Sequence, residues 1–204
     1  MDRTFPFTGR PCGGRELGWP MLALAAAYEL DFNKRYLRAM KTLADLALEY
    51  QDPETGGWLE LLTGGHCECG AENHYGEAAF IRAIRLNGLY RYYKLSGDER
   101  MPECIRRGTD DLNRIVWEED RSGWRYTPCP ASHFFGQGGV IMMTMANAVR
   151  LLDDPEHKRI LRKAWTALFE HRKPDSPKRE GVGKAFGSGL YGLAEAASVL
   201  AEDG

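Results

Sequence analysis

The feature that most constrains the fold is an internal repeat of helical hairpins joined by long loops. Tyr28–Leu30 aligns with Tyr93–Leu95, and Gly57-Trp58 then falls close to Gly123-Trp124. The short turns match as well, at residues 31–35, 96–100 and 153–157. A repeat with one kind of short turn and one kind of long loop places all the long loops at the same end of the molecule. Because loops carry most functional residues, we expect the functional site at that end.

The spacing of apolar residues predicts seven helices and no clear strand pattern. The helices are expected at Glu16–Leu30, Lys34–Gln51, Glu77–Leu95, Glu99–Glu118, Gly138–Leu152, Pro155–Arg172 and Gly183–Glu202. A short extended pair is expected near Trp58–Leu62 and Trp124–Thr127.

The predicted helices are of two kinds. The even-numbered ones are amphipathic, as in the second, where Tyr36, Met40, Leu43 and Ala47 recur at three- and four-residue steps. The odd-numbered ones are apolar nearly all round and rich in small residues, which indicates that protein surrounds them. An inner row of apolar helices inside an outer row of amphipathic ones is an all-α, α/α toroid-like fold. The long loops then lie above the N-termini of the inner helices, where the helix dipoles favour anionic ligands.

Length and charge exclude several classes of protein. A chain of 204 residues is expected to form one domain over its whole length. With 27 basic and 29 acidic residues and a net charge of −2, it has no basic stripe for nucleic acid. No apolar run reaches membrane-spanning length, so no membrane partner is expected. The N-terminus shows no secretory signal, which predicts a cytoplasmic protein whose five cysteines are reduced thiols.

The repeat also carries a family resemblance. The turn Leu95–Arg100 and the loop Thr55–Trp58 resemble the (α/α) toroid superfamily, which includes six-hairpin glycosidases, toroid polysaccharide lyases and uronyl epimerases. The resemblance covers most of the chain and implies a carbohydrate-active domain. Seven helices, however, are too few to close a ring of six hairpins. The sequence leaves three alternatives open: a piece of a larger protein, an incomplete toroid, or a protomer that closes its ring as a homo-oligomer.

The resemblance implies a site for an acidic sugar or oligosaccharide. A glycosidase needs two carboxyl groups, and Glu16, Glu68, Glu72 and Glu77 lie at loop ends. A lyase or epimerase needs a base and a cation that holds the uronate carboxylate. The candidate catalytic residues are His66, Glu68, His74, Tyr75, Tyr126 and His133. The candidate substrate-binding residues are Arg15, Glu16, Trp19, Trp58, Trp124, Arg125, Phe134 and Lys184.

Some of these residues also have structural interpretations. Glu16 and Glu77 fall in first helical turns, where a carboxylate offsets the helix dipole. Trp58 and Trp124 follow equivalent glycines and suit the gaps between adjacent hairpins.

The loop cysteines suggest a metal site as an alternative. Cys12, Cys67, Cys69 and Cys129 all lie in long loops, and thiolates together with imidazoles are ligands that zinc prefers. The Cys67-Glu-Cys69 spacing departs from the usual C-x-x-C pair, however. The alternatives are thiols that brace crowded loops and, in an oxidising compartment, disulfides. On this interpretation the domain is a noncatalytic interaction module.

A further resemblance involves Gln51–Trp58, which is similar to the Gln-Trp repeat of triterpene cyclases. Those enzymes and the zinc-dependent protein prenyltransferases are also α/α toroids. The second copy, Glu118–Trp124, lacks the glutamine, and the chain contains no Asp-x-Asp-Asp motif. We therefore attribute this similarity to shared hairpin packing and keep a terpene cyclase-like function as a second alternative.

Overall fold

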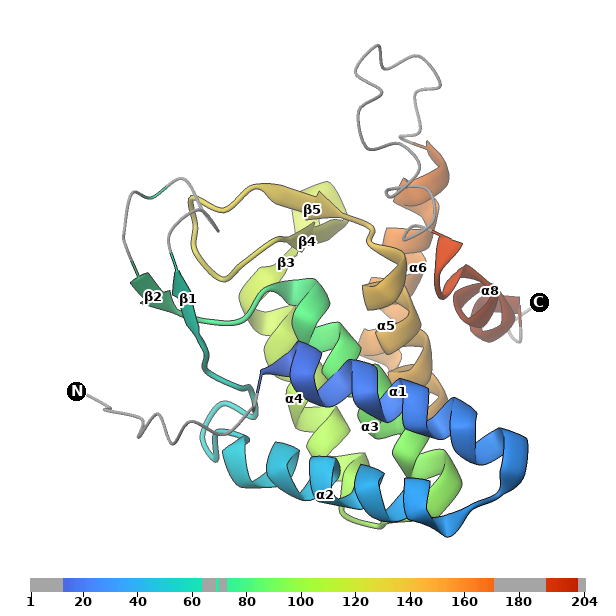
Figure 1. Cartoon of the computed structure of the whole chain (residues 1–204). Helices are drawn as coiled ribbons and strands as arrows, with labels where there is room; N and C mark the ends of the chain where they lie inside the picture. Colours follow the sequence, from blue (N-terminus) through green and yellow to red (C-terminus); the bar gives the residue numbers. More distant parts are fainter. Residues whose placement is uncertain (1–12, 64–68, 70–72, 171–189, 202–204) are drawn as a thin grey trace.

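The computed structural model describes residues 13–63, 69, 73–170 and 190–201 (Figure 1). Its helices are α1 Gly14–Asp31, α2 Lys34–Tyr50, α3 Ala79–Ser96, α4 Met101–Val116, α5 Gly139–Leu152, α6 Pro155–Glu170 and α8 Leu193–Ala201. These positions confirm the seven predicted helices, and the ends of the first six differ by a few residues. The last helix was predicted from Gly183, but α8 begins only at Leu193. Residues 183–189 lie outside the described residues, and Tyr191 and Gly192 form a turn, with φ of 88° at Gly192. None of the helices in the described ranges is long and apolar enough to cross a membrane.

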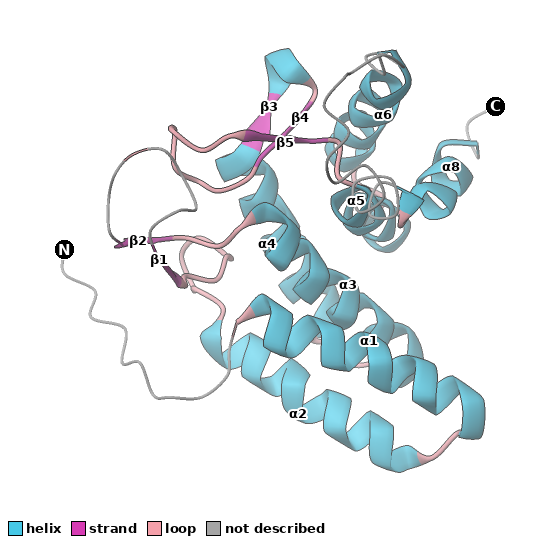
Figure 2. Ribbon diagram, turned by 45° about the horizontal axis from the view of Figure 1, so that its top comes forward, coloured by secondary structure: helices cyan, strands magenta, loops and turns pink. Residues whose placement is uncertain are grey.

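The helices form two layers. Each of the pairs α1–α2, α3–α4 and α5–α6 is a packed hairpin. Helix α3 packs against both α1 and α5, and α5 packs against α8, so these four helices form the inner row. Figure 2 shows α2, α4 and α6 outside this row. The arrangement confirms an α/α toroid-like array that forms part of a ring.

The short turns share one backbone conformation. Each inner helix of the three hairpins ends at a residue in the left-handed conformation: Phe32, Gly97 and Asp153, with φ of 55°, 68° and 50°. Such a residue ends a helix because its N–H bonds back to a carbonyl of the last turn. An Asx side chain then begins the outer helix, as where Asp154 Oδ1 accepts a bond of 2.8 Å from the Glu156 N–H. The sequence repeat is therefore a repeat of turn geometry.

The long loops contain short strands, which the sequence only partly predicted. The strands are β1 Leu61–Thr63, β2 Asn73–Tyr75, β3 Trp117–Glu118, β4 Gly123–Arg125 and β5 Phe134–Gly136. The two segments expected to pair with each other each contain part of a strand, but each strand pairs within its own loop. β1 pairs antiparallel with β2, and β4 lies between β3 and β5 in a separate sheet. The expected pair was wrong because each loop folds back on itself before it reaches the next hairpin.

Small residues let the inner helices touch backbone to backbone. A Cβ built on Gly18 of α1 would lie 2.5 Å from the carbonyl oxygen of Ile84 in α3. One built on Gly88 would lie 3.0 Å from the carbonyl oxygen of Gly18. Two glycines that face each other therefore set the close approach of α1 and α3.

Helix α3 departs from the apolar character expected of an inner helix. It buries Arg82, Arg85 and Asn87, none of them more than 1% exposed. Asn87 joins α3 to α5, since its side chain bonds to the Val140 carbonyl and to Asn147 at 3.0 Å each. Burial of these polar groups is tolerated because the arginines pair with carboxylates and Asn87 has hydrogen-bond partners on α5.

Candidate functional site

The long loops lie at one end of the structure, where the inner helices begin (Figure 1). The Gly14 N–H, in the first turn of α1, donates to Glu60 Oε1 at 2.8 Å. The Ala79 N–H, at the start of α3, donates to the Tyr126 carbonyl at 2.9 Å. Each loop thus caps the start of an inner helix. Residues far apart in the sequence meet at this end because the inner helices run in the same direction.

Four rings from three segments form a continuous surface here, which we call the aromatic platform: Phe80, Tyr126, His133 and Phe135. Phe80 stacks on Tyr126 and on Phe135, with ring centroids 5.7 and 5.8 Å apart and planes 22° apart in both pairs. Tyr126 also stacks on His133 at 4.6 Å. A backbone hydrogen bond holds Tyr126 and His133 together, because the Tyr126 N–H donates to the His133 carbonyl at 2.9 Å.

The platform has an exposed side and a cation beside it. The His133 side chain is exposed, and the three other rings are half-buried. The guanidinium carbon of Arg15, an exposed residue of α1, lies 5.1 Å from the centre of the Phe80 ring. Aromatic faces suit the apolar faces of sugar rings, and a nearby guanidinium suits a carboxylate. Two of the predicted site residues, Tyr126 and His133, therefore lie together, with Arg15 beside the same platform.

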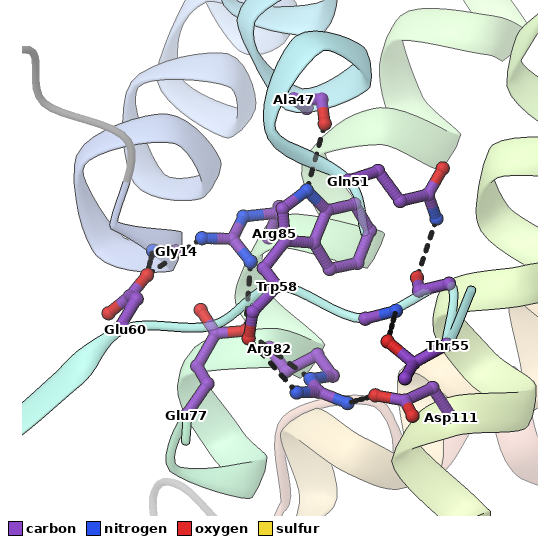
Figure 3. Close-up of polar contacts among 12 residues, drawn as sticks. Gly14, Ala47, Gln51, Thr55, Trp58, Glu60, Glu77, Arg82, Arg85 and Asp111 are labelled. Atoms are coloured by element: carbon purple, nitrogen blue, oxygen red, sulfur yellow. Dashed lines mark hydrogen bonds and ion pairs between the residues drawn. The ribbon is translucent and has the colours of Figure 1, made fainter. Parts of the chain in front are cut away.

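Beneath this end lies a set of charged side chains, which we call the buried ion network: Glu60, Glu77, Arg82, Arg85 and Asp111. Arg85 binds Glu77 and Glu60 at 2.8 Å each (Figure 3). Arg82 binds Glu77 at 3.3 Å and also pairs with Asp111 of α4. The network therefore connects the loop end to the outer helix through the core.

Only Glu60 in this network reaches solvent. Its side chain is 25% exposed, whereas Glu77 and both arginines are at most 1% exposed. Burial and the neighbouring Glu77 carboxylate raise the pKa of Glu60 to about 7 from an ordinary 4.5. A carboxyl group with such a pKa is partly protonated at neutral pH, which suits a general acid.

Three carboxyl groups surround the first turn of α1. A Cβ on Gly13 would collide with Glu16 Oε2 and would lie 3.5 Å from Glu60 Oε1. A Cβ on Gly14 would collide with Glu77 Oε1, which is buried and accepts no hydrogen bond from the described residues. The two glycines thus leave room for carboxyl groups that any larger residue would displace.

The structure gives Trp58 and Trp124 a packing role. Trp58 is 1% exposed and Trp124 is fully buried. Trp58 donates to the Ala47 carbonyl at 2.8 Å, and Trp124 donates to Asn113 Oδ1 at 3.1 Å. Of the two interpretations left open by the sequence, the structure therefore favours the plug between hairpins and leaves no ring face for a sugar.

Three other predicted substrate-binding residues lie away from the platform or are already engaged. Arg125 donates to the Ile115 carbonyl at 2.8 Å, so its guanidinium is turned toward the end of α4. The guanidinium carbon of Arg121 covers the Phe134 ring at 3.6 Å. Trp19 is 46% exposed and makes an edge contact with Tyr191 at 6.5 Å, next to α8.

The remaining candidates are not placed by the structure. His66, Glu68, Lys184, Cys12 and Cys67 lie outside the described residues, as does Glu72. His74 and Tyr75 are described only as backbone in β2, which pairs with β1 at the long-loop end.

The predicted zinc site is described only in part. Cys69 is exposed, and Cys129 is a half-buried, unbridged thiol; each lies in a long loop. Among the residues with a described placement, no group of three histidine, cysteine or carboxylate side chains could hold a metal ion. Cys104 of α4 is buried, and burial raises its pKa to about 12, so this thiol is unreactive at neutral pH.

Sequence reasoning missed Glu60, Phe80, Arg82 and Arg85. Arg82 and Arg85 gave one usable signal, since they are three residues apart in a helix that the repeat places in the inner row. Buried arginines require acidic partners, which points to nearby carboxylates. Glu60 had no such signal, because its environment depends on Gly14 and Glu77, which lie far from it in the sequence.

Comparison with known proteins shows the fold. No family model matches the chain, and no curated protein matches it by sequence. An α-mannanase of family GH76 from Bacteroides thetaiotaomicron matches with a TM-score of 0.60 at 13% identity, over 76% of this chain and 43% of that one. The chain has the α/α toroid fold. At this identity the likeness shows the fold alone.

Two further solved structures are inactive variants of an α-1,6-mannanase of Salegentibacter sp. HEL1_6, each with two neighbouring aspartates replaced. One binds α-1,6-mannotriose and the other α-1,6-mannotetrose. They match with TM-scores of 0.59 and 0.60 at 9% identity, over 81% and 82% of this chain. The matched region is 43–50% of the length of these three solved chains, so this chain spans about half their length.

The present chain also contains two pairs of adjacent aspartates, and the members of both pairs make contacts that stabilise the fold. In the first pair, Asp110 binds His157 at 2.8 Å and Asp111 belongs to the buried ion network. In the second, Asp153 ends α5 and Asp154 caps the start of α6. These contacts lie within the hairpins, whereas the platform and the carboxyl groups around α1 lie at the long-loop end.

Proposed function

We propose that this domain is carbohydrate-active and binds an acidic oligosaccharide at its long-loop end. The observation that carries the proposal is the stack of Phe80, Tyr126 and Phe135 with Arg15 beside it. Sugar rings stack on such faces, and the guanidinium can bind a uronate carboxylate. The fold is consistent with this role, although a fold by itself does not determine a function.

Binding can be tested by calorimetry with oligogalacturonate, alginate oligosaccharides and α-1,6-mannotriose. Replacing Phe80 or Tyr126 by alanine is expected to weaken binding roughly tenfold, because each change removes one stacking face. Phe169→Ala is a matched control, since this ring is 52% exposed but lies on the outer helix α6. No binding by any member of the panel, or equal affinity in all the variants, would contradict the proposal.

The preference for an acidic sugar is a separate test. Arg15→Met keeps the length of the side chain but removes the charge beside Phe80. We expect this variant to lose affinity for the uronate-containing oligosaccharides and to keep its affinity for α-1,6-mannotriose. An equal loss for charged and neutral sugars would show that Arg15 does not select the carboxylate.

The second candidate is an interaction module with structural zinc. It is favoured by the placement of Cys69 and Cys129 in the long loops. Elemental analysis of purified protein tests it directly. A folded, metal-free sample in which the thiols of Cys12, Cys67, Cys69 and Cys129 all titrate would end this alternative.

A terpene cyclase-like function has less support. The Gln51 amide, part of the Gln-Trp resemblance, donates to the Gly56 and Cys104 carbonyls at 2.7 and 2.9 Å. It therefore joins α2, its own loop and α4. Hairpin packing explains the resemblance without a shared reaction.

A further inference from the structure

We propose that Glu60 is the proton donor of this site, a neutral carboxylic acid at the mouth of the buried ion network that works with Glu16 as the nucleophile to hydrolyse glycosidic bonds with retention of configuration. This inference rests on the proposed function and names the reaction and the residues that perform it. The sequence had not singled out Glu60.

Two carboxyl groups share one buried arginine at this site. Arg85 pairs with both Glu77 and Glu60, while Arg82 pairs with Glu77 and Asp111. Asp111 has a second, more exposed partner in Arg114. Two carboxylates that share Arg85 in a buried site repel each other, which favours the neutral form of one of them. The raised pKa of Glu60 has the same two causes, burial and Glu77.

One hydrogen-bond acceptor beside Glu60 lacks a donor. Glu60 Oε1 itself accepts bonds from the Gly14 N–H and from Arg85, both at 2.8 Å, and these two bonds favour its ionised form. Glu77 Oε1 is buried and lacks a donor among the described residues, although buried acceptors are nearly always satisfied. Figure 3 shows Glu60 and Glu77 on the same side of Arg85. A proton on Glu60 supplies the missing donor in the free protein.

Glu60 is placed to deliver this proton to a ligand. It is the one carboxyl group of the network with a partly exposed side chain, at 25%. It binds the backbone of Gly14, and the next residue, Arg15, covers Phe80 of the platform. The first turn of α1 therefore contacts both the acid and the platform.

Glu16 is the partner because of its position and its exposure. A Cβ built on Gly13 would collide with Glu16 Oε2 and would lie 3.5 Å from Glu60 Oε1. The two carboxyl oxygens therefore lie on the same side of Gly13. They are therefore closer than the ~6.5–9.5 Å that an inverting pair needs for its water molecule. Retaining pairs are about 5–5.5 Å apart, so this geometry favours retention.

The reaction balances with these two groups and water. The O–H bond of Glu60 breaks as the glycosidic oxygen takes the proton, and the C1–O bond breaks with its electron pair on that oxygen. The Glu16 carboxylate attacks C1 and forms a covalent glycosyl ester. Water then attacks C1, its proton returns to Glu60, and the ester electron pair returns to Glu16.

The first experiment compares two substrates in wild type and in Glu60→Gln. One substrate is the panel oligosaccharide that binds most tightly, and the other is the dinitrophenyl glycoside of its sugar. We expect hydrolysis of the oligosaccharide to fall about 10²–10⁴-fold, because general-acid catalysis contributes about that much. Hydrolysis of the dinitrophenyl glycoside should fall less than about tenfold, since dinitrophenolate leaves without a proton.

Glu49→Gln is the matched control. Glu49 is an exposed carboxylate of the outer helix α2, so its removal should leave both rates unchanged. An equal loss for both substrates in Glu60→Gln would overturn the donor role. So would an oligosaccharide rate equal to that of the wild type. Nuclear magnetic resonance of the first product should show the anomer of the substrate, and the opposite anomer would overturn the role of Glu16.

A readout independent of turnover separates this inference from the proposed function. Infrared difference spectra between wild type and Glu60→Gln at pH 6 should contain the carbonyl stretch of a protonated carboxyl group. Absence of this band would overturn the neutral state of Glu60 whether or not a glycan binds. Glycan binding without any hydrolysis would overturn the donor role while the binding proposal stands, and absence of binding would remove the proposed function itself.

Discussion

The guanidinium carbon of Arg85 lies 4.5 Å from the centre of the Trp58 indole ring, and both side chains are buried. One face of the arginine is covered by the aromatic ring, while its nitrogens bind Glu77 and Glu60. The tryptophan that fills the space between the first two hairpins therefore also forms a wall of the ion network. Packing and charge are coupled at this point of the fold.

Replacing Arg85 by methionine should destabilise the protein by about 3–5 kcal/mol, because the Glu77 charge loses a buried partner. Urea unfolding followed by circular dichroism measures the change. Arg106→Met is the control, since Arg106 is 44% exposed and its pairs with Glu103 and Asp110 should contribute at most about 1 kcal/mol. Similar losses in the two variants would show that the buried ion pairs contribute no more to the free energy of unfolding than the exposed ones.

Replacing Trp58 by alanine should destabilise the fold by about 3–5 kcal/mol, because it leaves a cavity and removes the bond to the Ala47 carbonyl. Trp19→Ala should cost far less, about 1 kcal/mol, because Trp19 is 46% exposed. Thermal unfolding of both variants tests the packing role of Trp58. A Trp58 variant as stable as the Trp19 variant would contradict the described burial.

The pH dependence of stability should change when Glu60 is replaced by glutamine. The folded-state pKa of Glu60, about 7, lies above the ordinary value of 4.5, so the folded state binds its proton more tightly than the unfolded state does. This contribution is complete below pH 4.5 and is lost as the pH rises through about 7, at a cost of at most about 3 kcal/mol.

Glu60→Gln removes this titration. Relative to wild type it should therefore gain stability between pH 5 and pH 8, as read from urea unfolding at each pH. Glu49→Gln should follow the wild-type curve, because Glu49 is exposed on α2. A constant difference between Glu60→Gln and wild type across this range would be inconsistent with a raised pKa.

Gly18→Ala should destabilise the protein by several kcal/mol, because its Cβ would lie 2.5 Å from the Ile84 carbonyl oxygen. Relief would require α1 and α3 to move apart. Ala26→Ser, at an exposed position of α1, should change stability by about 0.5 kcal/mol or less. Calorimetric unfolding of the two variants measures the difference, and a tolerated alanine at position 18 would contradict the close approach of these helices.

Several elements could be predicted because their causes are local. The apolar spacing of α2 and α4 is a property of single helices, and the left-handed turns at Phe32, Gly97 and Asp153 follow repeated short motifs. The hairpin repeat then fixed the alternation of inner and outer helices and the common end of the long loops. Strand pairing was missed, because two loops of similar sequence can pair with each other or within themselves.

The candidate site was predicted only where loop position was sufficient. Tyr126, His133 and Arg15 were expected at the long-loop end, and the structure places Tyr126 and His133 in one aromatic stack with Arg15 beside it. Trp58 and Trp124 come from the same loops but are turned inward, since a large ring in a gap between hairpins gains more from burial than from exposure.

The sequence by itself determined the helices, their amphipathic or apolar character, the short turns and the side of the molecule on which function is expected, because each depends on residues a few positions apart. Only the tertiary structure decided which charged groups lie together and how they shift the pKa of Glu60. The environment of Glu60 is set by Gly14, Glu77 and Arg85, at sequence separations of 46, 17 and 25 residues. Burial and electrostatic coupling depend on distances in space, and the chain order alone does not contain those distances.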